Sequence, residues 1–164
     1  MPDSAIHLSA VVIGGGPAGL MVAEQLSKAG ITVDLYDAMH TVGRKFLRAG
    51  IGGLNLTHNE GWDDFVGRFG HKAAVLKPAL DAFNAINLRS WAADLGVDTF
   101  VGSSGRVFPV EKKAAPLLRR WLSRLRENRV RIHSRHRWLG WNQQDELLIQ
   151  GPSSILTINA ALTF

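Results

Sequence analysis

Short apolar runs and glycine-rich turns alternate along the first part of the chain. Apolar residues at 8–13 end in three glycines, and residues 17–28 then carry apolar side chains at helical spacing until Gly30. A β-branched run at 31–36 follows directly. This order predicts a strand, a turn, a helix and a second strand. The second strand should be parallel to the first, because the helix provides the crossover between them.

The middle of the chain predicts loops and small helices. Residues 40–60 contain four glycines, which leave room for one short helix after Gly43. Residues 61–95 show helical spacing in short pieces, with Pro78 suited to a first turn and Asn87 to a helix cap. Residues 97–110 predict two extended pieces around a Gly/Ser turn, and residues 112–126 predict an amphipathic helix.

The last part of the chain predicts strands again. Residues 129–133 favour another parallel strand. Alternating runs at 136–141, 146–151 and 154–160, separated by polar or Gly-Pro turns, are typical of an antiparallel meander. The pattern therefore predicts an α/β, Rossmann-like fold over residues 1–164 as a single domain. It combines a parallel sheet, inserted small helices and a C-terminal β-meander.

Composition restricts the chemistry that this domain can perform. The chain has 164 residues, of which 46% are hydrophobic, enough for one domain with a core. It has no cysteine, which excludes disulfides, thiolate metal sites and redox cysteine pairs, so redox chemistry requires a bound cofactor. We predict no metal site. Because no segment is typical of a signal peptide or a membrane span, we predict a cytoplasmic protein with no membrane partner.

Charge is unevenly distributed along the chain. The net charge is +5, yet residues 111–137 contain ten Lys or Arg and only two Glu. Such a basic segment is suited to nucleic acid or another polyanion. The alternative is the solvated face of a helix and of the strand after it. The sequence leaves both interpretations open.

The triplet Gly14, Gly16 and Gly19 fits the pattern G-x-G-x-x-G at the first strand–helix turn. The first glycine allows a tight turn, the second lets a pyrophosphate approach the backbone, and the third lets the helix pack closely. Turn amides and the positive helix end near Pro17 would bind the phosphates. The triplet alone is a weak signal for a dinucleotide.

Asp37 strengthens the dinucleotide interpretation. It lies eighteen residues after Gly19, at the end of the second predicted strand. A carboxylate there accepts hydrogen bonds from the ribose hydroxyls of an adenosine and repels a 2′-phosphate, which favours FAD or NAD over NADP. The alternative is a glycine turn with Asp37 as an ordinary surface residue.

Three blocks of the sequence resemble known flavoproteins. The form GGGPAG at 14–19 resembles the first motif of the superfamily related to glutathione reductase. "GRKFLRAGIGGLNLTH" at 43–58 and "GSSGRVFPVEKKAAPLLRRWLSRL" at 102–125 are similar to segments of the BaiN/RdsA-like family of bacterial NAD(P)/FAD-dependent oxidoreductases. This resemblance covers essentially the whole chain and implies a Rossmann-like FAD-binding domain.

The resemblance also implies which residues contact FAD. It places the glycine turn on the pyrophosphate, Asp37 on the ribose, the block after the second strand on the phosphates and the flavin end, and the backbone near Trp138 on the adenine. The predicted contacts are Gly14, Gly15, Gly16, Pro17, Ala18, Gly19, Asp37, Gly43, Arg44, Lys45, Gly52, Gly53, Asn55 and Trp138.

Alternatives remain for several of these residues. Arg44 and Lys45 are alternatively two solvated loop charges, Asn55 a brace of its own loop, and Trp138 a core side chain. Leu54 stands where many relatives have an arginine, so any role of that arginine is lost or moved. His58 and Arg106 are candidates for substrate contact or for structural roles. No catalytic residue is assigned.

The implied function is that of a flavin-dependent oxidoreductase. Hydride would pass between NAD(P)H, the flavin and a conjugated carbonyl-type or RNA-base acceptor, since known activities of the family are reduction of a steroid enone and of uridine in ribosomal RNA. Family members are more than twice as long and return to the parallel sheet after the meander. We therefore expect an N-terminal fragment that ends before the next parallel strand. The alternative is a non-catalytic, basic RNA- or partner-binding module that retains the dinucleotide fold.

Overall fold

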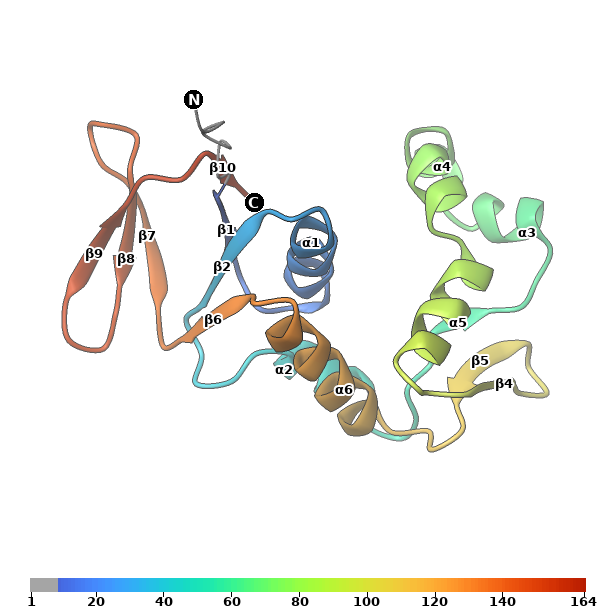
Figure 1. The fold of residues 1–164 in the computed structure, drawn as a ribbon. Coiled ribbons are helices and arrows are strands. Elements are labelled where there is room, and N and C mark those ends of the chain that lie inside the picture. Colours follow the sequence, from blue (N-terminus) through green and yellow to red (C-terminus); the bar gives the residue numbers. More distant parts are fainter. Residues whose placement is uncertain (1–8) are drawn as a thin grey trace, which may run out of the picture. The chain divides into compact units, whose positions relative to one another are not determined.

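The computed structural model describes residues 9–164, which form two compact units (Figure 1). The first unit contains the residues up to Phe46 together with Leu122–Phe164, and the second contains Leu47–Trp121. Leu8, the first residue of the first predicted strand, lies outside the described residues.

A parallel sheet of order β10-β1-β2-β6 forms the centre of the first unit. β1 (Ser9–Ile13) pairs in parallel with β2 (Thr32–Asp37), and α1 (Pro17–Lys28) connects them. β2 pairs in parallel with β6 (Arg131–Ser134), and β1 with β10 (Leu162–Thr163). The predicted α/β fold with a strand–helix–strand unit is confirmed.

β10 corrects the expectation that the chain ends before the next parallel strand. Leu162 aligns with Ala10, and the Phe164 N–H donates to the Val11 carbonyl (2.9 Å). The Ile13 N–H donates in turn to the Phe164 carbonyl (2.8 Å). A strand of two residues is too short to show a hydrophobic period, so the sequence pattern did not predict it. It forms because the backbone N–H and C=O groups along the edge of β1 need hydrogen-bond partners.

Each face of the sheet buries a different partner, as strand alternation requires. Val11 and Tyr36 form a buried cluster with Leu147 and Ile149 of the meander. Val12, on the opposite face of β1, lies against α1 and is also buried. Apolar residues on both faces explain why β1 has a continuous apolar run.

The antiparallel meander predicted near the C-terminus is confirmed. β7 (Arg137–Trp141), β8 (Leu147–Gln150) and β9 (Ile155–Ile158) form a three-stranded sheet. A register shift between Trp138 and Gly140 interrupts the pairing of β7 with β8. This bulge lies in the edge strand, where an unpaired residue is tolerated.

The second unit contains short helices and a small antiparallel sheet of order β3-β5-β4. Its elements, in chain order, are β3 (Thr57–His58), α3 (Trp62–Gly67), the 3₁₀ helix η1 (Gly70–Lys72), α4 (Ala73–Ala82), α5 (Ala85–Asp94), β4 (Thr99–Val101) and β5 (Arg106–Pro109). The predicted small helices and the Gly/Ser hairpin are therefore present, and β3 is an additional strand that the sequence pattern did not predict.

Two predictions within this unit were wrong. Pro78 lies inside α4 and not in its first turn, because the helix already begins at Ala73. Asn84, not Asn87, caps α5: its side chain accepts hydrogen bonds from the N–H groups of Ile86 (2.9 Å) and Asn87 (3.1 Å). The Asn87 side chain accepts one back from the Asn84 N–H (3.1 Å), which completes a capping box.

The chain passes between the units within two helices, α2 (Arg44–Ala49) and α6 (Ala114–Glu127). α2 is the short helix predicted after Gly43, and α6 is the predicted amphipathic helix. Leu117, Trp121 and Leu125 are buried on one face of α6. In the part of the chain that the structure describes, no helix is both long and apolar enough to cross a membrane.

Candidate functional site

The turn between β1 and α1 has the geometry that its three glycines allow. Gly14 has a φ of 100°, which favours glycine, and its N–H donates to the Tyr36 carbonyl (2.8 Å). A Cβ at Gly19 would overlap the Gly14 carbonyl oxygen. At Gly16, by contrast, no heavy atom lies within 4 Å of the position that a Cβ would take. The turn therefore has no room for a side chain at Gly19, whereas the space beside Gly16 is open.

The open side of this turn faces the N-terminus of α1. The helix begins at Pro17 after Gly16, and no side chain caps it. Its first N–H groups, including those of Ala18 and Gly19, lack acceptors within the helix, and the positive end of the helix dipole favours an anion. Free donors beside an open space fit a diphosphate group.

Two backbone N–H groups hold the carboxylate of Asp37 at the end of β2. The Gly15 N–H donates to Oδ2 and the Met39 N–H donates to Oδ1, both at 2.7 Å. Asp37 is half-buried, and each of its carboxylate oxygens can accept a further hydrogen bond. The side chain is therefore fixed beside the glycine turn and can still accept from the two hydroxyls of a ribose.

The loop after β2 is fastened onto the glycine turn. The Gly43 N–H donates to the Gly15 carbonyl (2.7 Å), and Gly43 has a φ of 72°. A Cβ at Gly15 would overlap the side chain of Val42 and lie 3.1 Å from Oδ2 of Asp37. Gly15 therefore lets the loop and the carboxylate approach the turn closely.

Arg44 and Lys45 begin α2, and both side chains are exposed. The Arg44 guanidinium lies 3.4 Å from Nε2 of His40. Within residues 9–164 neither cation forms an ion pair with a carboxylate. Their charges are available to an anion, and their predicted contact with the cofactor phosphates stays a prediction.

The start of the meander lies beside the backbone of Asp37. The His136 N–H donates to the Asp37 carbonyl (2.9 Å). Trp138 is 42% exposed, and its Nε1 donates to the Gly140 carbonyl (2.9 Å). Its ring lies edge-on to that of Trp141, with 6.1 Å between centroids. Trp138 is thus not a core side chain, and its contact with an adenine stays a prediction.

The residues predicted for the flavin end belong to the second unit. Gly52 and Gly53 have φ angles of 87° and 135°, in the region that glycine adopts readily. Asn55 is an exposed loop residue. In the amide orientation that satisfies its hydrogen-bond partners, its side-chain nitrogen donates to the carbonyls of Thr57 (2.9 Å) and Val107 (3.2 Å). Asn55 therefore braces its own loop, and its contact with a flavin stays a prediction.

His58 and Arg106 lie opposite each other on β3 and β5. Nε2 of His58 lies 2.9 Å from the Ser104 carbonyl and therefore donates to it, while Nδ1 lies 3.5 Å from the Glu60 carboxylate. The Arg68 guanidinium donates to both oxygens of Glu60 (2.6 and 2.8 Å), which lowers the pKa of that carboxyl. These contacts hold the Gly/Ser turn against β3.

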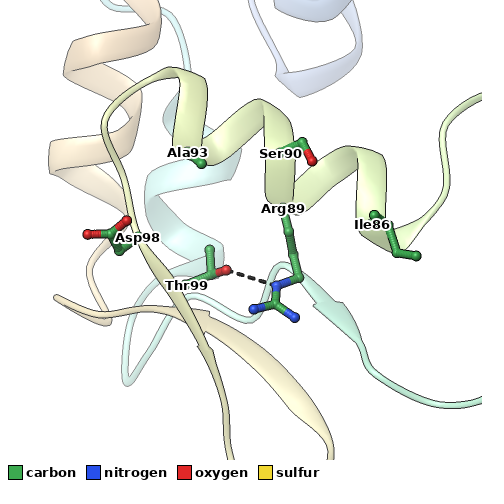
Figure 2. Close-up of a pocket in the computed structure, with 6 residues that line it drawn as sticks. All are labelled: Ile86, Arg89, Ser90, Ala93, Asp98 and Thr99. Atoms are coloured by element: carbon green, nitrogen blue, oxygen red, sulfur yellow. Dashed lines mark hydrogen bonds between the residues drawn. The ribbon is translucent and has the colours of Figure 1, made fainter.

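A hollow of about 370 Å³ also lies in the second unit, between α5 and β4. Figure 2 shows Arg89 reaching from α5, with its Nε donating to Oγ1 of Thr99 (3.0 Å). The carboxylate of Asp98 points away from this guanidinium (Figure 2). Because its polar groups do not converge, this hollow is a weaker candidate for a cofactor than the glycine turn.

Some residues that position the site were not singled out from the sequence, namely Met39, Val42 and His136. The hydrogen bond from Met39 to Asp37 spans two residues and forms a local turn that aspartate favours, so a local pattern could have found it. Val42 and His136 meet the site through contacts between segments, for which the sequence offers no local signal.

Comparisons with known proteins agree with this geometry. Residues 8–161 match a family model described as the HI0933-like protein Rossmann domain. Over 50 residues, the chain is 44% identical to a protein named ribosomal RNA dihydrouridine synthase from Haemophilus influenzae. That match covers 30% of this chain and 12% of the relative.

Solved structures share the fold at low sequence identity. THI4 from Thermovibrio ammonificans aligns with a TM-score of 0.62 and 15% identity, over 96% of this chain and 55% of that one. The p-nitrophenol 4-monooxygenase PnpA from Pseudomonas putida DLL-E4 aligns with a TM-score of 0.56 and 17% identity, over 95% of this chain and 40% of that one. The chain thus spans about half the length of THI4 and less of PnpA.

Proposed function

This chain belongs to the family of HI0933-like protein Rossmann domains, and from that premise we propose that it is the FAD-binding part of a flavin-dependent oxidoreductase. The hydrogen bond between Gly15 and Asp37 carries the proposal. It joins the turn that suits a pyrophosphate to the carboxylate that suits a ribose, at one edge of one sheet. An adenine dinucleotide needs both groups in this arrangement.

FAD is the dinucleotide that the residues support best. The carboxylate of Asp37 would repel the 2′-phosphate of NADP. The GGGPAG form at 14–19 and the block at 43–58 favour FAD over NAD, because both resemble flavoprotein segments. When bound, FAD would supply hydride transfer through its flavin ring.

The chain's own groups would bind and orient this cofactor. The N–H groups of Ala18 and Gly19 would donate to the pyrophosphate, for which Gly16 leaves space. Asp37 would accept hydrogen bonds from the ribose hydroxyls. The exposed cations of Arg44 and Lys45 would offset the negative charge of the phosphates.

For the reaction, we infer NAD(P)H as the reductant and a conjugated carbonyl-type compound or an RNA base as the acceptor. The name of the Haemophilus influenzae relative supports the RNA base. So does the basic segment at 111–137, whose ten Lys or Arg suit a polyanionic substrate. In both acceptor classes hydride would add to the carbon β to a carbonyl, and a proton would go to the α carbon.

The experiment is a titration of the purified 164-residue chain with FAD, followed by absorbance between 350 and 500 nm and by quenching of flavin fluorescence. We expect saturable binding of FAD, and loss of the flavin absorbance when NADH is added. A folded chain that takes up no FAD would contradict the proposal.

A second candidate function is a basic RNA- or partner-binding module that keeps the dinucleotide fold without turnover. The ten Lys or Arg between residues 111 and 137 favour it. RNA binding that weakens steeply with salt, in a chain that ignores FAD, would support this candidate over the first.

A further inference from the structure

A second polar hollow, of about 700 Å³, lies in the first unit, far along the strands from the glycine turn. Thr32 and Arg131 line it at the amino ends of β2 and β6, whereas the glycine turn and Asp37 lie at the carboxyl ends of parallel strands. Its volume falls within the range of small-molecule sites. Its polar lining comprises Ser27, Thr32, Arg126, Asn128, Arg129 and Arg131.

Three arginine residues line this arginine hollow, and no acidic residue of the described chain does. Nε of Arg131 donates to Oδ1 of Asp34 (2.7 Å), so one of the three cations is paired. Arg126 and Arg129 form no ion pair with any residue between 9 and 164. The ends of α1 and α6 each add about half a negative charge. The charges of the three arginines together exceed those of Asp34 and both helix ends, so the hollow favours an anion.

Arg129 occupies a backbone conformation that is unusual for its residue type. Its φ is 62°, in the left-handed region. Two hydrogen bonds close the end of α6 around it, from the Arg129 N–H to the Arg126 carbonyl and from the Val130 N–H to the Leu125 carbonyl, both at 2.9 Å. This pair of bonds is the Schellman motif, whose left-handed residue is usually glycine.

Two other helices of this chain end in the same motif with glycine. α1 closes around Gly30 (φ 80°) and α5 around Gly96 (φ 72°). Arginine replaces glycine only at the end of α6 among these three, although glycine would adopt the conformation with less strain. The arginine retained there, Arg129, is one of the residues that line the hollow. A residue that is kept in a strained conformation beside a candidate site supports the hypothesis that its side chain has a function there.

We propose that the arginine hollow binds a small phosphorylated ligand, of diphosphate size or larger, distinct from a dinucleotide on the glycine turn. The planar guanidinium groups of Arg126 and Arg129 match two phosphate oxygens each. The side chains of Thr32 and Asn128, which also line the hollow, can supply neutral donors. These residues line one concave space, which favours a small ligand over an extended nucleic acid.

Inorganic tripolyphosphate added to the ¹⁵N-labelled 164-residue chain tests this proposal by NMR. We expect saturable shifts of the Thr32, Asn128 and Arg129 amides. The amides of Gly14 and Gly16 report separately on any binding at the dinucleotide turn, so the two sites are distinguished in one titration. Shifts confined to the glycine turn would overturn the proposal.

The variant Arg129→Gly separates function from structure. Glycine relieves the left-handed strain, so the melting temperature should stay the same or rise, while tripolyphosphate binding weakens by roughly tenfold. Arg135→Gly is the matched control, because Arg135 is exposed, has a φ of 61° and does not line the hollow. It should leave tripolyphosphate binding unchanged.

Arg126→Gln provides an independent variant, since Arg126 lies within α6 and its substitution leaves the helix end intact. It too should weaken binding. Unchanged affinity in both Arg126→Gln and Arg129→Gly would overturn the proposal, as would binding of RNA oligonucleotides without binding of tripolyphosphate.

Discussion

The backbone N–H of Gly15 donates a hydrogen bond to the Asp37 carboxylate at 2.7 Å, across 22 residues of sequence. The same carboxylate accepts a second bond from the Met39 N–H. Its orientation is therefore fixed before any ligand arrives, and little side-chain freedom is lost when a ribose binds. This pre-organisation makes Asp37 the most direct place to test the proposed cofactor site.

Substitution Asp37→Ala should weaken FAD binding by roughly ten- to a hundredfold, because charge-assisted hydrogen bonds to the ribose are lost. Flavin fluorescence quenching measures the affinity. Asp94→Ala, at an exposed aspartate of the second unit, serves as the control and should bind FAD like the unmodified chain. Equal affinity of the two variants would remove Asp37 from the site.

Substitution Gly16→Ala should separate binding from folding. The new methyl group meets no heavy atom within 4 Å, and the backbone at Gly16 is extended, so the melting temperature should change by less than about 2 °C. The methyl group would occupy the space proposed for the pyrophosphate, so FAD affinity should fall. A variant that binds FAD normally would show that the phosphates lie elsewhere.

Substitution Gly19→Ala should instead destabilise the fold. Its methyl group would overlap the Gly14 carbonyl, which forces α1 away from the turn at a cost of about 1–3 kcal/mol. Gly67→Ala in α3 is the matched control, since nothing lies within 4 Å of the added methyl group. Urea denaturation measures both, and similar midpoints for the two variants would contradict the close packing at Gly19.

The buried ion pair between Glu24 and Arg124 should stabilise the first unit. Glu24 is fully buried in α1, and its carboxylate lies 3.0 Å from Arg124 of α6 and 2.6 Å from Lys28. Glu24→Ala leaves Arg124 without this partner and should cost about 3–5 kcal/mol of unfolding free energy. The exposed Glu127→Ala should cost less than about 0.5 kcal/mol. Comparable losses in urea denaturation would contradict the structural role of the pair.

Acid should loosen the contact between Glu60 and Arg68. The hydrogen bonds from Arg68 lower the pKa of Glu60, so the folded state favours the ionised carboxylate. This contribution is present above the ordinary glutamate pKa of about 4.3 and is lost as pH falls through the lowered value. Melting temperatures between about pH 5 and 3 should therefore fall less steeply for Glu60→Gln than for the unmodified chain. Parallel curves would refute the expectation.

Local pattern explains which elements could be predicted. α1 has the predicted bounds because Pro17 begins it, Gly30 ends it and apolar residues repeat at helical spacing between them. The cap of α5 was misplaced by three residues because Asn84 and Asn87 are chemically equivalent cap residues, and their reciprocal hydrogen bonds depend on where the chain turns. β3 and β10 were missed because two residues carry no period.

For the candidate site, the sequence was sufficient for the glycine turn and for the place of Asp37 at a strand end, since both follow from residue type and spacing along one segment. Folding brought Gly15 to Asp37, β10 to β1, and the arginines at 126, 129 and 131 around one hollow. Periodicity reports only the face of its own element on which a residue lies. Contacts between distant segments depend on strand register, on available sheet edges and on how helix ends close, and these are set when the elements pack together.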